Sequence, residues 1–345
     1  MRALALFAAI ALSTAPRPAA AAAVERARYL MGTVCTAAAE APDTARAADA
    51  IAAAFDEIAR LERVMSSWTA ESELSRLNAA AAEAPFRASA DLLAAVAAAL
   101  DAAEETAGAF DPTIEPLDLA WDMRGRGRVP GDAEISAALA RVGWRGVALD
   151  RAAATVRFAA PGMGLDLGGI GKGVALDRAA EILARHGVTR ALLNFGGEIM
   201  ALSPDAPWTV TVAHPGDRMR PVIGFTVRQA AISTSAQSER GVEVRGRHYG
   251  HILDPHAGRP LERAASATVV TTGATRADAL STALLVMGRE RAGTFAALHP
   301  DLGVLWLEPA GRAVEAWRWN LADAAALPGA DVRWRNELST RRTTP

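Results

Sequence analysis

Three short segments in the second half of the chain combine hard oxygen ligands, a cation and closely spaced glycines. Residues 166–177 read Asp-Leu-Gly-Gly-Ile-Gly-Lys-Gly-Val-Ala-Leu-Asp, residues 251–258 read His-Ile-Leu-Asp-Pro-His-Ala-Gly, and residues 277–282 read Ala-Asp-Ala-Leu-Ser-Thr. Carboxylate and hydroxyl oxygens suit Mg²⁺, and glycines let a backbone approach a phosphate closely. Together the three segments predict a site for a Mg²⁺-bound pyrophosphate.

Asp278 and Thr282 lie four residues apart at the start of a predicted helix, 278–287. Side chains at this spacing share one helix face, so a carboxylate and a hydroxyl would lie side by side. Mg²⁺ takes few protein ligands and completes its shell with water and phosphate. A structural alternative stays open, because Thr275 to Asp278 also fits a capping box that only closes the helix N-terminus.

The segment from Asp166 to Gly173 places four glycines around Lys172. A helix that begins here points its positive end at the same place, which favours an anion, and Lys172 adds a mobile cation. The pattern is neither a Walker A loop nor the dinucleotide fingerprint G-x-G-x-x-G. The structural alternative is a glycine-rich turn packed in the core with Lys172 solvated.

His251 stands at the end of a predicted strand, where an imidazole can accept a proton or hold a phosphate. The alternative is a partly buried histidine with satisfied hydrogen bonds. In the N-terminal half, Trp68 could stack on a planar ring and Met31 could form a soft apolar wall, with core packing as the alternative for each. The double glycine before Glu198 is explained equally well by packing.

Hydrophobic spacing and turn residues predict a mixture of helices and strands without strict alternation, which favours an α+β fold. Asp43 is the predicted N-cap of the first helix, and Gly108 and Gly187 are predicted to end two others. The predicted helices are 43–65, 71–80, 89–107, 173–186 and 278–287. The predicted strands are 147–149, 155–158, 191–195, 209–213, 222–228, 230–233, 248–253 and 267–271, with 295–304 and 314–317 completing the core and 125–131 an exposed connection.

The composition and the two ends of the chain limit its possible partners and its cellular location. The 345 residues are 51% hydrophobic with a formal net charge of −2 and no dense basic stripe, which argues against a nucleic-acid partner. Residues 1–23 resemble a signal peptide, because the apolar stretch Ala3–Ala15 is shorter than the roughly 20 residues of a membrane span. An uncleaved anchor or a disordered tail is the alternative. We expect a periplasmic or equivalent extracytoplasmic protein that is not integral to the membrane, with a loose tail at 336–345.

The single cysteine, Cys35, excludes an intramolecular disulfide. It lies in a predicted strand, Thr33–Ala37, where a small buried side chain fits. It is not a lipobox cysteine, because it sits beyond the signal segment with Met-Gly-Thr-Val ahead of it.

Eight motifs in a fixed order resemble the ApbE family, the FAD:protein FMN transferases, over roughly residues 29 to 310. They are Met-Gly-Thr at 31–33, Ser-Glu-Leu-Ser-Arg-Leu-Asn at 72–78, Gly-Ala-Phe-Asp-Pro-Thr at 108–113, the 166–173 segment, Asn-Phe-Gly-Gly at 194–197, Thr-Ser at 234–235, and the 251–258 and 277–282 segments. The resemblance implies a T-fold-like α+β domain over 24–335, with mixed sheets packed with helices. It also implies that FAD binds in a cleft between two sub-lobes, about 24–160 and 161–335.

The resemblance also implies roles for individual residues. Gly169, through its carbonyl, and Asp278 and Thr282 would bind Mg²⁺, and Asp166, Lys172, His251 and Asp278 would serve the reaction. The predicted FAD contacts are Met31, Trp68, Ala109, Phe110, Asp111, Asp166, Lys172, His251 and Ile252.

The implied activity is Mg²⁺-dependent transfer of FMN from FAD to a threonine hydroxyl, with release of AMP. The implied acceptor is a flavoprotein subunit of a membrane redox complex. FAD hydrolysis to FMN and AMP is one alternative, and a non-catalytic exported flavin-binding protein is another. An NAD(P) oxidoreductase is disfavoured because its dinucleotide fingerprint is missing from the sequence.

Overall fold

The computed structural model describes residues 22–238 and 240–335. The predicted tail at 336–345, and all but the last two residues of the predicted signal peptide, lie outside this part of the chain. The helices are α1 (Thr44–Met65), α2 (Glu73–Ala80), α3 (Ala90–Glu105), α4 (Glu115–Trp121), α5 (Asp132–Leu139), α6 (Gly171–Arg185), α7 (Ala274–Met287) and α8 (Arg289–Leu298), with a 3₁₀ turn at Trp144–Gly146. The strands are β1 (Ala22–Leu30), β2 (Thr33–Ala41), β3 (Phe86–Arg87), β4 (Val147–Asp150), β5 (Thr155–Phe158), β6 (Arg190–Phe195), β7 (Glu198–Leu202), β8 (Trp208–His214), β9 (Asp217–Val227), β10 (Ala230–Ala236), β11 (Gly241–Val244), β12 (Arg247–Gly250), β13 (Leu253–Asp254), β14 (Arg259–Pro260), β15 (Ser266–Thr271), β16 (Gly303–Ala310), β17 (Ala313–Trp319), β18 (Ala325–Ala326) and β19 (Val332–Trp334).

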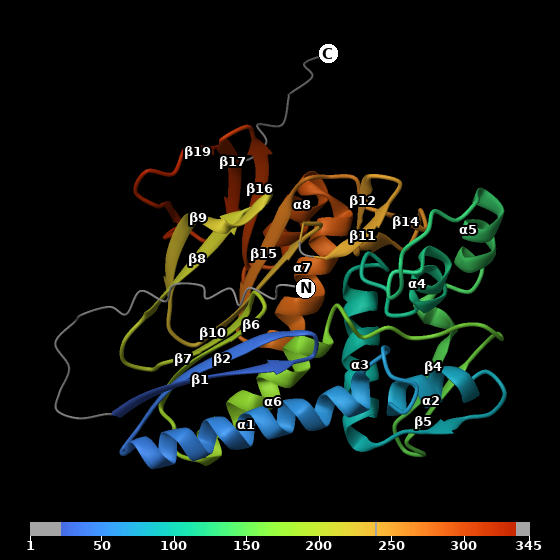
Figure 1. The fold of residues 1–345 in the computed structure, drawn as a ribbon, viewed down its shortest axis with the longest axis horizontal. Helices are drawn as coiled ribbons and strands as arrows, with labels where there is room; N and C mark the ends of the chain where they lie inside the picture. Colours follow the sequence, from blue (N-terminus) through green and yellow to red (C-terminus); the bar gives the residue numbers. More distant parts are fainter. Residues whose placement is uncertain (1–21, 239, 336–345) are drawn as a thin grey trace.

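A nine-stranded sheet forms the centre of the molecule (Figure 1), in the order β1-β2-β6-β7-β10-β15-β16-β17-β19. Neighbouring strands are antiparallel except β17 and β19, which are parallel. The hairpin β1–β2 turns through Met31 and Gly32, both with positive φ, as a two-residue hairpin turn requires. Cys35 is fully buried in β2, as predicted.

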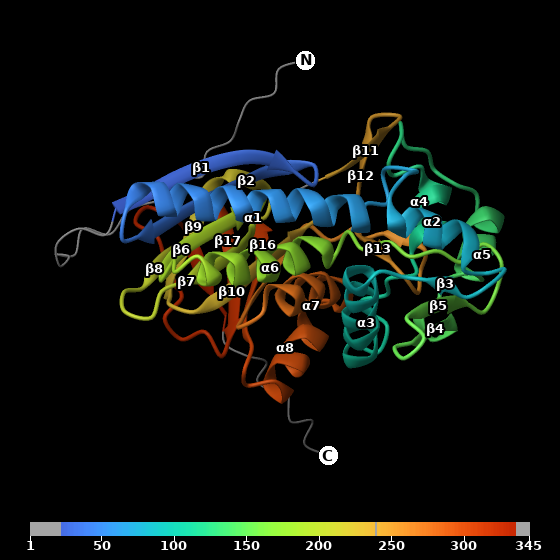
Figure 2. The same cartoon turned by 90° about the horizontal axis from the view of Figure 1, so that it is seen from below.

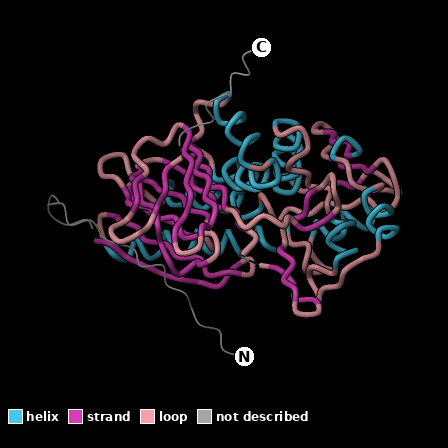
Figure 3. The backbone as a smooth tube through the Cα atoms, turned by 90° about the horizontal axis from the view of Figure 1, so that it is seen from above, coloured by secondary structure: helices cyan, strands magenta, loops and turns pink. Residues whose placement is uncertain are grey.

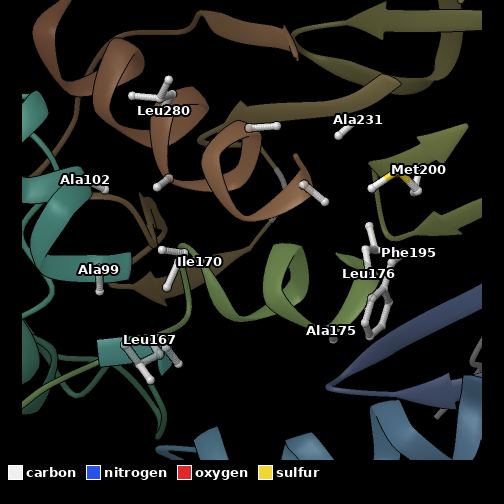
Figure 4. Packing of buried hydrophobic residues seen from close by; sticks show 14 of the residues in the cluster. Ala99, Ala102, Leu167, Ile170, Ala175, Leu176, Phe195, Met200, Ala231 and Leu280 are labelled. Atoms are coloured by element: carbon white, nitrogen blue, oxygen red, sulfur yellow. The ribbon is translucent and has the colours of Figure 1, made fainter. Parts of the chain in front are cut away.

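Helices α1, α6 and α7 cover one face of this sheet and pack side by side (Figure 2), with α1 against β1 and α7 against β10 and β15. Ala175 and Leu176 of α6 lie near Phe195 of β6 in Figure 4, and all three are fully buried. The opposite face carries the smaller sheet β18-β9-β8, and a second apolar core lies between the two sheets.

The remaining elements form a region at one end of the sheet, rich in short helices and loops (Figure 3). It contains α2 to α5, the sheet β3-β5-β4 and the hairpin β11–β12. A small core of its own is built around Trp121 and includes Leu253. Between this region and the helical face of the large sheet lie the segments that the sequence singled out.

The predicted α+β class is confirmed, and the first helix begins as expected, since the Asp43 carboxylate accepts the N–H of Arg46 at 2.7 Å. Gly187, with positive φ, follows the end of α6 as predicted. Two predictions are wrong. The expected strand 248–253 is interrupted at His251, and Phe295 belongs to α8, so that the next strand begins only at Gly303. Among the described residues no helix is long and apolar enough to cross a membrane.

Candidate active site

A cavity of about 660 Å³ lies between the short-helix region and the α6–α7 pair. That volume is within the usual range for small-molecule sites. It is lined by every predicted site residue except Met31. Met31 packs against the main core, while its neighbour Gly32 belongs to the cavity wall. The structure therefore brings the separated sequence segments to one place.

Helices α6 and α7 cap each other at the floor of this cavity. The Asp278 Oδ2 atom, on α7, accepts the N–H of Gly173 at 2.9 Å in the first turn of α6. In return the Asp177 carboxylate, on α6, accepts the N–H groups of Ala274 and Thr275 at 2.8 and 2.9 Å at the start of α7. The capping-box interpretation of Asp278 is thus wrong: α7 begins at Ala274, and Asp278 caps the other helix.

Gly173 has a structural reason to be glycine. A Cβ placed on it would lie 2.3 Å from the carbonyl oxygen of Ala274, so any side chain would push the two helices apart. Gly168 and Gly169 instead line the cavity. The glycine-rich segment therefore serves both the helix contact and the cavity wall.

Lys172 lies between two buried carboxylates rather than in solvent. Its Nζ atom is 3.1 Å from Oε1 of Glu198 and 3.9 Å from Oδ1 of Asp278. Both carboxylates are nearly inaccessible, at 4% and 2% exposure, so the alternative of a solvated Lys172 is wrong. Lys172 is therefore positioned at this end of the cavity by buried acids.

The groups around Asp278 fit a divalent cation. Burial raises the pKa of the Asp278 carboxyl, and Lys172 opposes that rise only in part. Thr282 lies one helical turn on, and a Cβ placed on Gly169 would be 3.5 Å from its Oγ1 atom, so the loop and the helix face each other closely. A buried carboxylate, a hydroxyl and a nearby backbone segment form an oxygen donor set of the kind that Mg²⁺ takes.

A second group of carboxylates lies nearer α4, and Asp118 and Asp166 of this group line the same cavity. One oxygen from each of Glu115, Asp118 and Asp166 lies within 4.8 Å of the others. The Arg124 guanidinium pairs with Glu115 and lies 2.7 Å from Asp166 and 3.4 Å from Asp118. Burial raises the pKa values of Glu115 and Asp118, for Asp118 well above the usual range, with the Asp166 charge adding to both shifts.

The Asp166 carboxylate accepts hydrogen bonds from three separate segments of the chain. Besides Arg124, its carboxylate accepts the Ser67 hydroxyl at 2.6 Å and the N–H of Gly168 at 2.7 Å. Neither Arg124 nor Glu198 stood out in the sequence as a functional residue. Arg124 lies in an unpatterned turn, and the double glycine before Glu198 was the only signal near it.

His251 is held in a defined orientation at the cavity wall. Its Nδ1 atom lies 3.2 Å from the Arg240 carbonyl oxygen, which accepts a hydrogen bond when Nδ1 carries the proton. Burial, helped by the Lys172 charge, lowers the pKa of His251 to about 4. The imidazole is therefore neutral at pH 7, with Nε2 available to accept a proton.

Three of the predicted FAD contacts, Trp68, Phe110 and Asp111, differ in how exposed they are. Trp68 lines the cavity with 64% of its surface exposed, so the core-packing alternative is wrong for it. Phe110 is buried against the glycine loop. The Asp111 carboxylate accepts the N–H and hydroxyl of Thr113 and the N–H of Trp144, which fixes the loop that carries it.

Comparison with known proteins agrees with this geometry. The model of the ApbE family matches residues 31–306. The FAD:protein FMN transferase of Treponema pallidum is 32% identical over 307 residues, covering 82% of this chain and 84% of that protein. That of Klebsiella pneumoniae is 34% identical over 240 residues, covering 69% and 75%.

Two solved structures share the fold. The flavin transferase ApbE of Vibrio cholerae superposes with a TM-score of 0.76 at 28% identity, covering 87% of this chain and 98% of that one. The ApbE protein of Thermotoga maritima superposes with a TM-score of 0.77 at 29% identity, covering 83% and 94%. With the family match spanning most of its length, this chain belongs to the ApbE family.

Proposed function

We propose that this protein transfers FMN from FAD to a threonine hydroxyl of an acceptor flavoprotein. One observation carries the proposal: a single cavity of suitable size brings Lys172, His251 and the Asp278–Thr282 pair together. The relatives named FAD:protein FMN transferase, which this chain matches over most of its length, support the same activity.

The reaction exchanges one phosphorus–oxygen bond for another. The threonine oxygen attacks the FMN-side phosphorus, the bond from that phosphorus to the bridging oxygen breaks, and AMP leaves with the bridging oxygen. The hydroxyl proton passes to Nε2 of His251, which is neutral and oriented through Nδ1. Lys172, at the start of α6, stabilises the negative charge that develops on the phosphates.

Gly169, Asp278 and Thr282 would hold Mg²⁺ in this proposal. The ion would supply positive charge to the pyrophosphate and its leaving group. The protein contributes the orientation: the Gly173 N–H fixes Oδ2 of Asp278, and Thr282 Oγ1 lies 3.2 Å from the Ser235 hydroxyl. Asp166 and the exposed face of Trp68 would contact FAD along the cavity wall.

We also propose that the mature protein works outside the cytoplasm, on a flavoprotein subunit of a membrane redox complex. The signal-like composition of residues 1–23 supports export. N-terminal sequencing of the native protein tests this. An intact Met1 on a cytoplasmic species would contradict it.

The activity is tested by AMP release from FAD, with and without Mg²⁺ and with and without an acceptor flavoprotein. EDTA should abolish release and Mg²⁺ should restore it, while the acceptor threonine gains the mass of FMN through a phosphodiester. If only free FMN and AMP form with every flavoprotein offered, the protein is an FAD pyrophosphatase. Undiminished turnover in metal-free buffer would remove the metal from the proposal.

A further inference from the structure

The hairpin β11–β12 stands between two cavities. Gly241 and Val242 of β11 line the candidate active site. All four residues of β12, Arg247–Gly250, line a second cavity of about 530 Å³, whose lining includes no residue of β11. This second cavity is called the β12 groove below. The edge of β12 that does not pair with β11 therefore faces the groove.

The outer edge of β12 is unpaired among the described strands, because β11 and β12 form a sheet of only two. The turn residues Arg245 and Gly246 both have positive φ, which defines a two-residue hairpin turn closed by the pair Val244–Arg247. The closing pair exchanges its hydrogen bonds within the hairpin, so the backbone groups of His248 and Gly250 point outward. Such an edge can pair with an extended segment of another chain.

The walls of the groove are predominantly basic. Arg247, Arg259 and Arg263 line it, against Glu262 as its one carboxylate. Arg247 pairs with Glu262 at 2.8 Å and Arg259 with Asp132 at 2.5 Å. All four side chains are at least half exposed, so both pairs contribute little and can exchange partners. The groove therefore favours a segment that carries acidic side chains.

The groove leads to the candidate active site. β12 continues directly into His251 and Ile252, which line the active-site cavity. At about 3.3 Å per residue, the path from Arg247 to His251 spans roughly 13 Å. Gln237, which lines the groove, donates to the carbonyl of Ile252 at 2.7 Å and accepts its N–H at 3.0 Å, so the two cavities are joined by one side chain.

We propose that the edge of β12 and the basic groove beside it bind an extended, acidic segment of the acceptor flavoprotein. The segment adds to β12 as a third strand, and its continuation places the acceptor hydroxyl at His251. The proposal rests on the proposed function, because it names the surface through which that reaction selects its protein substrate.

Three synthetic peptides test the surface by fluorescence anisotropy with the full chain and FAD. Each peptide has about 14 residues and contains one threonine. The first carries three Glu residues beside the threonine, and the second carries three Lys residues there. The third is the Glu peptide with alternate backbone nitrogens methylated. The Glu peptide should bind about tenfold more tightly than the Lys peptide at low salt. Methylation should weaken binding about tenfold, because it removes strand pairing.

Two variants and a control locate the binding. Arg247→Glu should remove the preference for the Glu peptide, and Glu262→Lys should strengthen it. Arg157→Glu is the control, since Arg157 is exposed on β5 and lines neither cavity. Equal affinity for all three peptides, no binding of any, or an Arg157→Glu effect as large as that of Arg247→Glu would each overturn the proposal.

Measuring AMP release from FAD without an acceptor distinguishes a failure of this proposal from a failure of the proposed function. Arg247→Glu should leave FAD affinity and AMP release unchanged while raising the KM for an acceptor that the wild type modifies. Loss of AMP release in the wild type itself would instead contradict the proposed function. Unchanged peptide preference in an active variant would contradict only the docking surface.

Discussion

Two acidic clusters face each other across the candidate active site, and they neutralise their charge differently. Near α4, the forked guanidinium of Arg124 contacts Glu115, Asp118 and Asp166. Near α7, the single ammonium of Lys172 lies between Glu198 and Asp278. Arginine presents five fixed donors, whereas a lysine ammonium is a compact charge on a flexible stem. The cation of the first cluster is thus held by several directed contacts, whereas that of the second is a single charge on a flexible stem.

This difference predicts different consequences for the two clusters. Changes in the Arg124 cluster should act mainly on stability and FAD affinity, because the arginine braces the wall that carries Asp166. Changes in the Lys172 cluster should lower turnover as well, because the proposed function places that charge at the reacting phosphates.

Asp278→Ala should lower turnover by at least about 100-fold, because a charged group that organises the transition state is lost. Asp177→Ala is a matched control: Asp177 caps α7 as Asp278 caps α6, but it does not line the cavity. The control should lose about 1–2 kcal/mol of stability and keep its turnover. Steady-state kinetics and thermal unfolding of both variants measure the two effects. Similar turnover in both variants would reduce Asp278 to a helix cap.

Arg124→Ala should destabilise the protein by about 3 kcal/mol, because it leaves buried carboxylates without their cation. Lys172→Ala also leaves two buried acids without their cation and should destabilise the protein by a similar amount, but it should in addition lower turnover by about 30-fold, since it removes a charge that stabilises the phosphates. Urea unfolding and single-turnover assays compare the two. The division between the clusters fails if Arg124→Ala loses more turnover than Lys172→Ala.

Replacing each cation by the other type tests whether its geometry, and not only its charge, matters. Arg124→Lys loses the forked contacts and should weaken FAD binding by about fivefold. Lys172→Arg keeps the charge but places a planar group between two buried acids, and should lower turnover by about tenfold with little change in FAD affinity. Calorimetric titration with FAD and turnover assays separate these outcomes. An FAD-binding defect confined to Lys172→Arg would reverse the assignment.

The smallest effect is expected for pH. Burial and the Lys172 charge both disfavour the imidazolium form, which is why the pKa of His251 lies near 4. Between pH 8 and 5.5 its protonation should therefore change the single-turnover rate by less than about twofold, whereas an ordinary histidine would lose about tenfold. An acid limb centred near pH 6.5, with FAD binding unchanged, would show that His251 has an ordinary pKa.

The sequence predicted local structure better than it predicted which groups meet. The helix after Asp43 was found because its cap and its apolar spacing are both local. The capping-box alternative for Asp278 was wrong because its partner, Gly173, lies on another helix, and no pattern within 275–278 reveals that contact. α4 was missed because it spans only seven residues and contains Pro116. Because α4 was not predicted, Arg124, which follows it, was not singled out as a functional residue.

The residues of the candidate site were located through the order of motifs, since each motif alone had a plausible structural explanation. The structure places all of them except Met31 in one cavity wall. It adds Arg124 and Glu198, whose importance depends on contacts across 42 and 26 positions of sequence, to Asp166 and Lys172 respectively. Such contacts depend on the packing of the sheet and helices and leave no periodic trace in the sequence.

The mutual capping of α6 and α7 has a consequence for hydrogen exchange. Each helix N-terminus donates to a carboxylate of the other, so neither first turn can fray without breaking a bond that the partner helix needs. The amides of Gly173 and Ala274, which would exchange early in isolated helices, should exchange only when the whole pair opens. Their protection should match that of the central strands, so the catalytic end of the cavity opens only in the slowest, most global fluctuations of the protein.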